Sequence, residues 1–550
     1  MLENAKKIID ILKTNGYEAY LVGGCVRDKI MDKEIHDYDI CTSAMPEEVI
    51  KAFKDFKVIE TGLKHGTVTI MFDDIGYEVT TYRCDGEYSD GRHPDSVVFV
   101  RDLKEDLLRR DFTMNAIVFD GNEYVDYFNG IDDIKNKTIR CVGDANTRFQ
   151  EDALRILRAM RFASQLDFDI EENTKKAMHE NKDLINKISV ERIATEFKKM
   201  IVGKNVRDVL LEFRDIVAVF IPEIEKTFDF DQKNDWHTFN VYEHIVRSVA
   251  SVEQNEVLRL AMFFHDIGKP DVFTIDEKGV GHFYGHNIRS EQIATDILKR
   301  LRFDNRTIDA VTLFVHNHDF NIPTTKKSVK KFMSKVGTDN FFDLLKIKCA
   351  DNLAQNIKKV TETHQLEKIQ QLFEIAVEVI EAKDCISIKQ LAISGDDIKK
   401  LGIPPSKIYS EILNELLDKV MQGEMLNIKE DLVNYVATHY MLKIVAKYEL
   451  GGKKFEITEY GKDYDDIERK LIEEIIEAKT KENPAKEDCK VEFRYWNLDF
   501  VVDFEEFIIN ELIDETEFIN KYCLMCGSQR CEGIKTDWFD GCQYRKCLKK

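Results

Sequence analysis

LVGGCVRDKIMDKEIHDYDIC, residues 21–41, is the most informative stretch of this chain. Gly23 and Gly24 follow an apolar strand and open a segment that can turn into a helix. Glycine allows backbone N–H groups to approach a phosphate closely, and Arg27 adds a positive charge for the same group. A Gly-Gly pair by itself more often marks a structural turn, so its interpretation depends on the residues that follow.

Two carboxylates near the end of the same stretch predict a metal site. Asp37 and Asp39 alternate with Tyr38 and Ile40 on an expected strand. Because side chains alternate across a strand, both carboxylates point to one face and both apolar side chains to the other. Two like charges held so close need a cation, and two Mg²⁺ ions could activate a 3′-hydroxyl and stabilise a leaving pyrophosphate. A solvated loop is the usual alternative, but the glycines and arginine upstream favour metal binding.

Length and composition restrict the class of protein. At 550 residues the chain is too long for one compact core, so we expect several domains. Hydrophobic residues make up 43% and charged residues 33%, a globular balance, and the few Gly and Pro residues favour a largely helical protein. The net charge of −21 argues against non-specific polyanion binding, although local basic faces decide RNA binding. Without a long apolar run or a secretory signal, we expect a cytoplasmic protein with no membrane partner.

The pattern of hydrophobic residues changes along the chain. Short β-rich runs occupy the first 145 residues, at 19–22, 67–72, 77–82, 97–100, 116–119 and 124–127. Beyond Glu151 apolar residues recur at helical spacing almost to the C-terminus, with breaks near 227–236 and 382–386 and a charged helix near 465–481. The sequence therefore predicts an α+β chain: a small head with a mixed β-sheet and helices, an all-α body and a cysteine-rich extension.

Two further motifs of the head follow the aspartate pair in order. In YEVTTYR, residues 77–83, Glu78 shares a strand face with Thr80 and Tyr82. RRDFTMNAI, residues 109–117, places two arginines and an aspartate directly before an apolar strand. Without the other motifs, Glu78 would be interpreted as an exposed carboxylate on a strand. The Arg-Arg-Asp sequence would be interpreted as a cluster of surface ion pairs.

In this order the motifs resemble the nucleotidyltransferase superfamily that includes CCA-adding enzymes and bacterial poly(A) polymerases. The resemblance is to the bacterial-eukaryotic class of CCA-adding enzymes. It implies that Glu78 is a third acidic group near metals held by Asp37 and Asp39. It also implies a contact with the ribose 2′-hydroxyl of the nucleotide, made by Arg109 or Arg110 together with Asp111.

EDALRILRAMRFA, residues 151–163, predicts the helix that selects the nucleobase. Asp152 and Arg155 are three residues apart and share a face of the expected helix. The resemblance implies that both bind the edge of the incoming base. Cytosine and adenine each carry an exocyclic amine that a carboxylate can accept from, and a guanidinium can donate to the neighbouring ring position. Arg158 and Arg161 resemble positions used for further nucleotide contacts; a surface salt bridge is the alternative.

The sequence leaves more than one product of the reaction open. Residues 82–99, YRCDGEYSDGRHPDSVVF, look like the flexible loop of CCA-adding and A-adding enzymes, which CC-adding enzymes lack. CCA-adding, A-adding and poly(A) polymerase activities remain, in that order. ERIATEFKKM, residues 191–200, resembles the neck motif of the family and is expected to support the nucleotide site by packing.

The second helical region contains a separate set of histidines and aspartates. They lie in YEHIVRSV, LRLAMFFHDIGKP, HFYGHNIRSEQIA, VHNHDF and KCADN, and the candidate ligands are His244, His265, Asp266, His286, His318 and Asp351. This order resembles an HD phosphohydrolase domain, and His316 competes with His318 for one position. Imidazole and carboxylate together suit Mn, Fe, Co, Ni or Zn, with a water to be activated. The resemblance implies phosphohydrolase action on damaged RNA ends; a vestigial or structural domain is the alternative.

The C-terminal part resembles the family only in its first section. Residues 390–427 resemble the tail region that in relatives grips the tRNA elbow. From about Leu450 no resemblance is found, and five cysteines crowd the end: Cys523, Cys526, Cys531, Cys542 and Cys547. Their spacing suits Zn²⁺ or an iron–sulfur cluster, with free thiols and disulfides as alternatives.

We therefore expect a nucleotidyltransferase head (1–150), neck and nucleobase-recognition helices (151–226), an HD domain (227–382), a helical tRNA-binding tail (383–448) and an extension (449–550). The expected activity is addition and repair of the CCA end of tRNA from CTP and ATP. Other hypotheses are an A-adding enzyme or poly(A) polymerase, an HD-domain phosphohydrolase acting on RNA ends with a degenerate head, and a non-catalytic RNA-binding scaffold. The presence of Asp37 and Asp39 together with Asp152 and Arg155 argues against a degenerate head and against a non-catalytic scaffold.

Overall fold

The computed structural model describes residues 2–35, 37–85, 97–403, 405–440, 442–450, 453–461, 467–475, 490–497 and 500–508. The chain forms two compact units, Met1–Ile322 with Thr338–Phe373, and Pro323–Gly337 with Glu374–Lys550. Residues 323–337 thus group with the C-terminal part, although the sequence places them in the middle of the second helical region. The described helices include none with both the length and the apolar character to cross a bilayer.

The head contains the expected mixed sheet, with strand order β3-β4-β5-β2-β1-β8-β9. Its strands are β1 (Ala19–Val22), β2 (Asp39–Thr42), β3 (Lys57–Ile59), β4 (Thr67–Phe72), β5 (Ile75–Thr81), β8 (Ile117–Phe119) and β9 (Tyr124–Asp126). Only β2 and β5 pair in parallel; every other neighbouring pair is antiparallel. A separate ribbon joins β6 (Arg83–Asp85) to β7 (Val97–Phe99). The strands expected from the sequence are confirmed to within two residues at each end.

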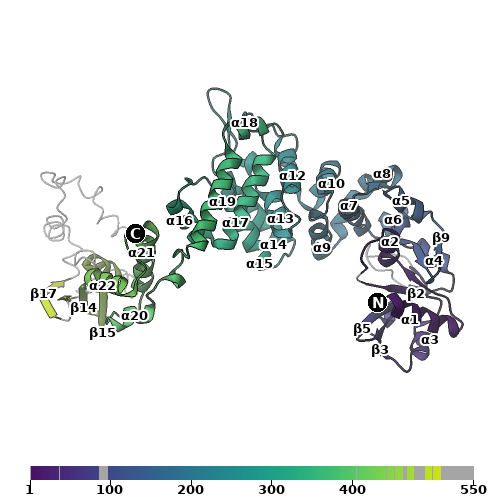
Figure 1. Ribbon diagram of the computed structural model, residues 1–550, viewed down its shortest axis with the longest axis horizontal. Coiled ribbons are helices and arrows are strands. Elements are labelled where there is room, and N and C mark those ends of the chain that lie inside the picture. The colour runs from purple at the N-terminus through teal and green to yellow at the C-terminus, as the bar shows by residue number, and fades with distance from the viewer. Residues whose placement is uncertain are drawn as a thin grey trace. The chain divides into compact units, whose positions relative to one another are not determined.

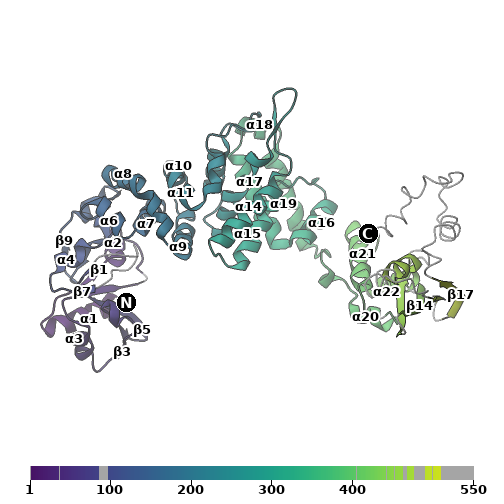
Figure 2. The ribbon, with the colours of Figure 1, turned by 180° about the vertical axis from the view of Figure 1, so that it is seen from behind.

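Helices pack against this sheet because each buries an apolar stripe. α1 (Leu2–Thr14) buries Ala5, Ile8, Ile9 and Leu12, and it contacts α3 (Pro46–Ala52) and strands β1 and β2. α2 (Gly24–Ile30) contacts β1, β8 and α5 (Gly130–Lys135). α4 (Leu103–Leu108) contacts β6. In Figure 1 the head is the purple and blue part of the chain, and Figure 2 gives the view from behind.

The helical part of the first unit continues directly from the head. Its first helices are α6 (Ala145–Glu151), α7 (Leu154–Leu166), α8 (Glu172–Asn181), α9 (Val190–Ile201), α10 (Val206–Glu212) and α11 (Arg214–Phe220). The next group is α12 (Val241–Ser251), α13 (Glu256–Phe264), α14 (His286–Arg300), α15 (Asn305–Asn317), α17 (Thr338–Leu353) and α18 (Ile357–Glu362). In this group α12 packs on α13 and α17, and α15 packs on α13 and α14, as Figures 1 and 2 show. Helix α19 (Gln365–Glu381) passes from the first unit into the second.

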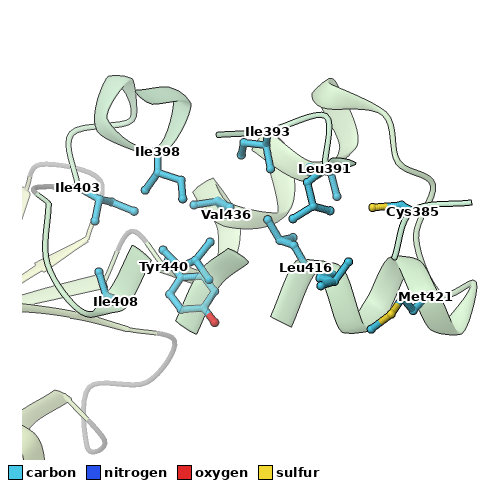
Figure 3. Close-up of a cluster of buried hydrophobic side chains, with 13 residues drawn as sticks. Cys385, Leu391, Ile393, Ile398, Ile403, Ile408, Leu416, Met421, Val436 and Tyr440 are labelled. Atoms are coloured by element: carbon cyan, nitrogen blue, oxygen red, sulfur yellow. The ribbon is translucent and has the colours of Figure 1, made fainter. Parts of the chain in front are cut away.

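The second unit has its own apolar core. Its helices are α16 (Lys326–Val336), α20 (Gly395–Lys400), α21 (Ile408–Gln422) and α22 (Lys429–Tyr440). Figure 3 shows Leu391, Ile398, Leu416 and Val436 from these and neighbouring segments pointing toward one another. Burial of such side chains contributes about 1.5–3 kcal/mol each relative to exposure, so this core accounts for the folding of the tail.

The expectation of helices almost to the C-terminus is wrong for residues 442–450, 453–461, 490–497 and 500–508, whereas the charged helix expected near 465–481 is present at 467–475. There β14 (Leu442–Leu450), β15 (Lys453–Gly461), β16 (Lys490–Asn497) and β17 (Phe500–Ile508) form an antiparallel sheet of order β15-β14-β16-β17. Ile444 and Ala446 are fully buried on β14, and Ile467 and Leu471 are buried on the intervening helix, 467–475. Alternating runs such as LKIVAKYEL carry a period of two, which is the signal for strands.

Candidate active site and a second candidate metal centre

The aspartate pair lies where strand β2 begins alongside the middle of the parallel strand β5. Asp39 is the first residue of β2 and Asp37 lies just before it, while Tyr38 and Ile40 are buried. The register of the parallel pair places Glu78 of β5 directly beside Asp39. The expected alternation is therefore confirmed, and three carboxylates share one accessible face. Tyr82, expected on the face of Glu78, lies past the end of β5 and is buried.

The electrostatics of Asp39 reflect this crowding. Partial burial and, after it, the charges of Asp37 and Glu78 together raise the pKa of Asp39 to about 6, while Arg110 acts in the opposite direction. The surroundings of Asp39 therefore disfavour its ionised form. A divalent cation removes this penalty, and oxygen ligands are those that Mg²⁺ prefers.

A glycine brings the backbone close to the carboxylates. Gly23 has φ +80°, a left-handed conformation that only glycine adopts readily. A Cβ there would lie 3.4 Å from Nη1 of Arg110 and 3.9 Å from Oδ2 of Asp39. Gly24 is the first residue of α2. The glycine turn, Arg110 and Asp39 therefore meet at one place, as a phosphate site beside a metal would require.

The two arginines of RRDF depend on a carboxylate that the sequence did not single out. Asp106 is 1% exposed. Its Oδ1 accepts from Nε and Nη2 of Arg109 at 3.1 and 2.8 Å, and its Oδ2 accepts from Nη2 of Arg110 at 3.3 Å. The backbone N–H of Arg83, in β6, donates to the same carboxylate at 3.2 Å. The sequence did contain a signal for this contact. Asp106, on α4, lies three residues before Arg109 and four before Arg110, the spacing at which side chains meet on one helix face.

A second group of arginines surrounds an aromatic ring. The guanidinium carbons of Arg27, Arg158 and Arg161 lie 5.1, 5.4 and 4.2 Å from the ring centre of Phe162. Nε of Arg161 also lies 2.8 Å from Glu196 of α9, within the expected neck motif. These are cation–π distances, so the ring helps to hold three positive charges together.

Asp111 and Arg27 are fixed by the same network. Asp111 accepts from Nε and Nη2 of Arg158 at 2.8 and 2.5 Å and from Nδ2 of Asn115 at 3.1 Å. Although burial acts to raise the pKa of Asp111, the charge and hydrogen bonds of Arg158 and Asn115 hold it at about 2. Asn115 in turn accepts from Nη1 of Arg27 at 3.0 Å. Asp111 is therefore an ionised, internally paired residue, and Arg110 is the one nearer the acidic face.

The expectation that Asp152 and Arg155 share one face of a helix is wrong. Helix α6 ends at Glu151, Asp152 is extended, and α7 begins at Leu154. Oδ2 of Asp152 pairs with Nη2 of Arg192 at 3.0 Å. A short side chain that accepts the Leu154 N–H, at 3.0 Å, favours such a break before a new helix.

Arg155 is tied to a different set of groups. Its Nη1 donates to Oε2 of Glu151 at 2.7 Å and to the Arg148 carbonyl at 3.1 Å. Its Nη2 donates to the Arg109 carbonyl at 2.7 Å. Arg155 therefore links helix α7 to the RRDF segment in this structure. The sequence could not show this contact, because the two residues lie 46 positions apart.

The histidines and aspartates of the second helical region converge. Nε2 of His244 lies 3.1 Å from Nε2 of His265, 3.2 Å from Oδ2 of Asp266 and 3.1 Å from Oδ1 of Asp351. On the other side of Asp266, Nε2 of His286 lies 3.4 Å from its Oδ1 and 3.0 Å from Nε2 of His318. Two sets of possible ligands result, sharing Asp266: His244 with His265, and His286 with His318.

The donor set fits divalent metals. Each imidazole has its Nδ1 against a backbone carbonyl, at 3.2, 2.6, 2.9 and 2.7 Å for His244, His265, His286 and His318. That contact fixes the tautomer and leaves Nε2 free for a metal. Asp266 is buried, and its Oδ2 lies 2.7 Å from Nζ of Lys269 and 3.2 Å from Nε2 of His265. Burial lowers the pKa of His318 to about 3. Although burial acts to lower it, hydrogen bonds with Asp266 and Asp351 raise the pKa of His244 to about 9, so a metal bound by His244 would displace a proton.

The structure selects His318 over His316. Nδ1 of His316 pairs with Oε2 of Glu291 at 2.7 Å. Nε2 of His318 points to the cluster instead, and its side chain is 2% exposed. The two residues differ because a shift of two positions turns a side chain to the other side of a helix.

Residues around the cluster form a cavity of about 660 Å³. Metal-ligand candidates lie on its wall together with Trp236, Phe283, Tyr284 and Phe320. His237 also lines it; its Nδ1 is buried without a hydrogen-bond partner, and burial, with the charge of Lys269, lowers its pKa to about 2. The sequence analysis missed His237, whose only signal is its place seven residues before His244.

The Gly-Lys of HDIGK also has a physical reason. Nζ of Lys269 lies 2.7 Å from Oδ2 of Asp266 and donates to Oε1 of Gln232 at 2.9 Å. A Cβ on Gly268 would lie 2.6 Å from the backbone nitrogen of Ser290, so only glycine allows α14 to approach so closely. The five C-terminal cysteines, Cys523, Cys526, Cys531, Cys542 and Cys547, lie outside the described residues.

Comparisons with known proteins cover most of the chain. The family described as the poly A polymerase head domain matches residues 19–140, the probable RNA and SrmB-binding site of polymerase A matches 167–227, and a putative tRNA nucleotidyltransferase domain 2 matches 283–436. The CCA-adding enzyme of Enterococcus faecalis is 34% identical over 436 residues, covering 79% of this chain and 95% of that protein.

Two further relatives agree. The CCA-adding enzyme of Lactobacillus helveticus is 51% identical over 212 residues, which are 38% of this chain and 53% of that one. The crystal structure of the Bacillus stearothermophilus CCA-adding enzyme in complex with CTP matches with a TM-score of 0.59 and 29% identity, covering 79% of this chain and 96% of that one.

Proposed function

Since this chain belongs to the family of CCA-adding enzymes, we propose that it transfers CMP from CTP and AMP from ATP to the 3′ end of tRNA. Nucleotidyltransferases of this family use Mg²⁺ and acidic residues of the head. The related Bacillus stearothermophilus enzyme was crystallised with CTP, which supports the same substrate here. Because tRNA and nucleotides are the substrates, we also infer a cytoplasmic location.

The proposal is carried by one observation, the meeting of three carboxylates where the start of β2 pairs with β5 at Glu78. Asp37, Asp39 and Glu78 would hold the ions, and the raised pKa of Asp39 supports a need for positive charge. When bound, divalent ions supply activation of the tRNA 3′-hydroxyl and neutralise the leaving pyrophosphate. Gly23 and Arg110, beside Asp39, would bind and orient the phosphates of the nucleotide.

Base selection is assigned to the segment that follows the head. Asp152 and Arg155 carry the acceptor and donors that the exocyclic amines of cytosine and adenine and their neighbouring ring atoms require. In the described arrangement these groups bind Arg192 and Glu151. We therefore propose that nucleotide binding exchanges these internal contacts for contacts with the base, while Arg158 and Arg161 hold the adjoining segment in place.

A stepwise extension assay tests this function against its alternatives. The substrate is a tRNA transcript ending at the discriminator base, incubated with each nucleotide alone and with all four together. CTP alone should extend the transcript by two residues, ATP alone should not extend it, and the mixture should complete CCA. Extension by ATP alone into a long ladder would identify a poly(A) polymerase, and extension of only CC-ended tRNA would identify an A-adding enzyme. The relatives compared above are CCA-adding enzymes, which favours the first outcome.

A second activity is supported by the cluster around Asp266. Four imidazoles and two carboxylates converge there, and the donor set fits divalent transition metals. When bound, such metals supply an activated water at neutral pH. Lys269 and the aromatic residues of the cavity would receive a phosphate and the nucleotide that carries it. We therefore propose a metal-dependent phosphohydrolase that acts on RNA ends.

Hydrolysis assays test the second activity separately from the first. RNAs ending in a 3′-phosphate, a 2′-phosphate or a 2′,3′-cyclic phosphate would be incubated with the protein and with Mn²⁺, Co²⁺, Ni²⁺ or Zn²⁺. Loss of the terminal monoester phosphate, or opening of the cyclic phosphate to a monoester, should require the metal and disappear in Asp266→Asn. If the protein adds CCA normally but hydrolyses none of these RNAs with any metal, the proposed phosphohydrolase activity is wrong and the cluster has only a structural role. The C-terminal cysteines as Zn²⁺ or iron–sulfur ligands stay a prediction of the sequence.

A further inference from the structure

Helix α16 (Lys326–Val336) is the most basic helix-forming segment that the two proposed activities leave without a role. Its sequence, KKSVKKFMSKV, has five lysines and no acidic residue. The whole chain has 101 acidic and 80 basic residues, so such a segment departs from the general composition. The sequence alone placed this helix in the second helical region, whereas the structure groups it with the tail.

The two faces of α16 differ. Val329, Met333 and Val336 are buried, and the helix packs on α21 of the tail. Lys327 and Lys331 are exposed and lie four residues apart, so they stand on one row of the helix surface. The row continues at Lys335, which is also exposed, about 12 Å from Lys327 along the axis.

Two other lysines of α16 share one carboxylate, whereas Lys327 and Lys331 face none among the residues that the structure describes. Nζ of Lys326 and Nζ of Lys330 both pair with Oδ2 of Asp384, at 3.0 and 2.8 Å. Lys327 instead donates to the neutral amide oxygen of Gln422 at 2.9 Å. Like charges four residues apart destabilise a helix by about 0.2–0.5 kcal/mol per pair, so the row at 327 and 331 costs stability and implies an external anionic partner.

We propose that the row of Lys327 and Lys331 on α16 contacts backbone phosphates of the tRNA substrate. The inference rests on the proposed CCA-adding function, which makes tRNA the polyanion that this acidic protein must bind. Lysine binds phosphate as a point charge, which suits contacts that position an RNA without reading its sequence. The apolar side of α16 anchors these charges on the tail, where the sequence resemblance expects tRNA contact.

The test compares two charge-matched double variants of the full-length protein. Lys327→Gln/Lys331→Gln removes the row. Lys54→Gln/Lys57→Gln removes two exposed lysines of the head and serves as control. Dissociation constants for a tRNA transcript lacking CCA would be measured by filter binding between 50 and 300 mM KCl, together with the kcat and KM of CMP addition. Thermal unfolding would verify that both variants fold.

The row variant should bind tRNA about three- to tenfold more weakly at low salt. The slope of log affinity against log salt should fall by about 1.4–1.8, because each phosphate contact releases roughly 0.7–0.9 counterions. The KM for tRNA should rise while kcat at saturating tRNA and the KM for CTP stay unchanged. An unchanged slope, or equal losses in both variants, would overturn the inference. If the wild-type protein adds no CMP, the proposed function fails instead, whatever the binding data show.

Discussion

Asp39 and Glu78 are paired residues on the adjacent parallel strands β2 and β5, although they lie far apart in the sequence. Asp37 completes the group two residues before the first residue of β2. The pKa of Asp39, raised to about 6 by burial and by its two acidic neighbours, records the cost of this arrangement in the absence of a cation.

Asp39→Asn should abolish activity and stabilise the metal-free protein at pH 7. A carboxyl whose pKa is higher in the folded than in the unfolded state loses stability once both states are ionised, that is, above about pH 6. Removing the charge should raise the unfolding free energy by up to about 1 kcal/mol after allowance for solvent screening. CMP addition should fall at least about 100-fold, because a metal ligand is lost.

Urea unfolding in EDTA and single-turnover CMP addition would measure the two effects. Asp74→Asn, in the turn between β4 and β5, is the control for removal of an exposed charge from the same sheet. Retained activity in Asp39→Asn would end the metal assignment.

Asp106→Asn should weaken nucleotide binding more than tRNA binding. The substitution keeps the size of the side chain but removes the charge that fixes Arg109 and Arg110. We expect the KM for CTP and ATP to rise about tenfold, the loss of one oriented charge-assisted contact of about 1.4 kcal/mol, with the KM for tRNA unchanged. Glu105→Gln, an exposed neighbour on α4, should change neither constant. Equal changes in both KM values would indicate a general folding defect instead.

Asp111→Asn should lower stability in a pH-dependent way. The Asp111 carboxyl has a pKa of about 2 in the fold, below its ordinary value of 3.8, through Arg158 and Asn115. A lowered pKa contributes stability above pH 4 that is lost as the pH falls toward 2. The contribution at pH 7 is about 2 kcal/mol.

Urea unfolding of wild type and Asp111→Asn at pH 7, 5, 4 and 3 checks this prediction. The difference in unfolding free energy between the two proteins should stay constant from pH 7 to 5 and become smaller below pH 4. In a double-mutant cycle with Arg158→Gln, most of the loss should disappear. A gap that does not depend on pH would mean that packing, not the ion pair, accounts for the loss.

Asp266→Asn and His318→Ala should each remove bound transition metal without impairing CCA addition. Asp266 lies between the two sets of histidines, so its amide should reduce metal content at both positions. His316→Ala is the matched control, because His316 binds Glu291 and points away from the cluster. Metal content would be measured by mass spectrometry of purified, dialysed protein. Equal metal in His318→Ala and His316→Ala would contradict the assignment.

Arg155→Ala should relax base choice and also cost stability. The side chain binds Glu151 and the carbonyls of Arg148 and Arg109, so its removal should destabilise the protein by about 1–3 kcal/mol. Misincorporation of UMP and GMP should rise relative to CMP and AMP. Glu151→Gln keeps a hydrogen-bond acceptor and should leave base choice unchanged. Unchanged selectivity in a folded Arg155→Ala protein would show that the guanidinium only joins segments.

The sequence by itself determined the features that depend on local spacing. Alternation at residues 37–40 predicted the shared face of two carboxylates, and the order of His244, HDIGK and His286 predicted a common metal site. Predictions from the sequence were wrong where a helix break, or the period of the hydrophobic pattern, could be read in two ways. Asp152 ends one helix before the next begins, and the four segments 442–450, 453–461, 490–497 and 500–508 form a sheet instead of helices. The resemblance to CCA-adding enzymes came from motifs in a fixed order along the chain.

Only the tertiary structure decided which distant groups meet. The parallel pairing of β2 with β5 brings Glu78 to Asp39, the packing of α4 brings Asp106 under two arginines, and the turn before α12 brings His237 to the cavity. Helix α16 joined the tail because its apolar face packs on α21, which left its lysines outside. Spacing along a chain describes one strand or helix at a time, whereas a site is made by side chains from several elements, and their packing depends on the burial of apolar surface over the whole unit.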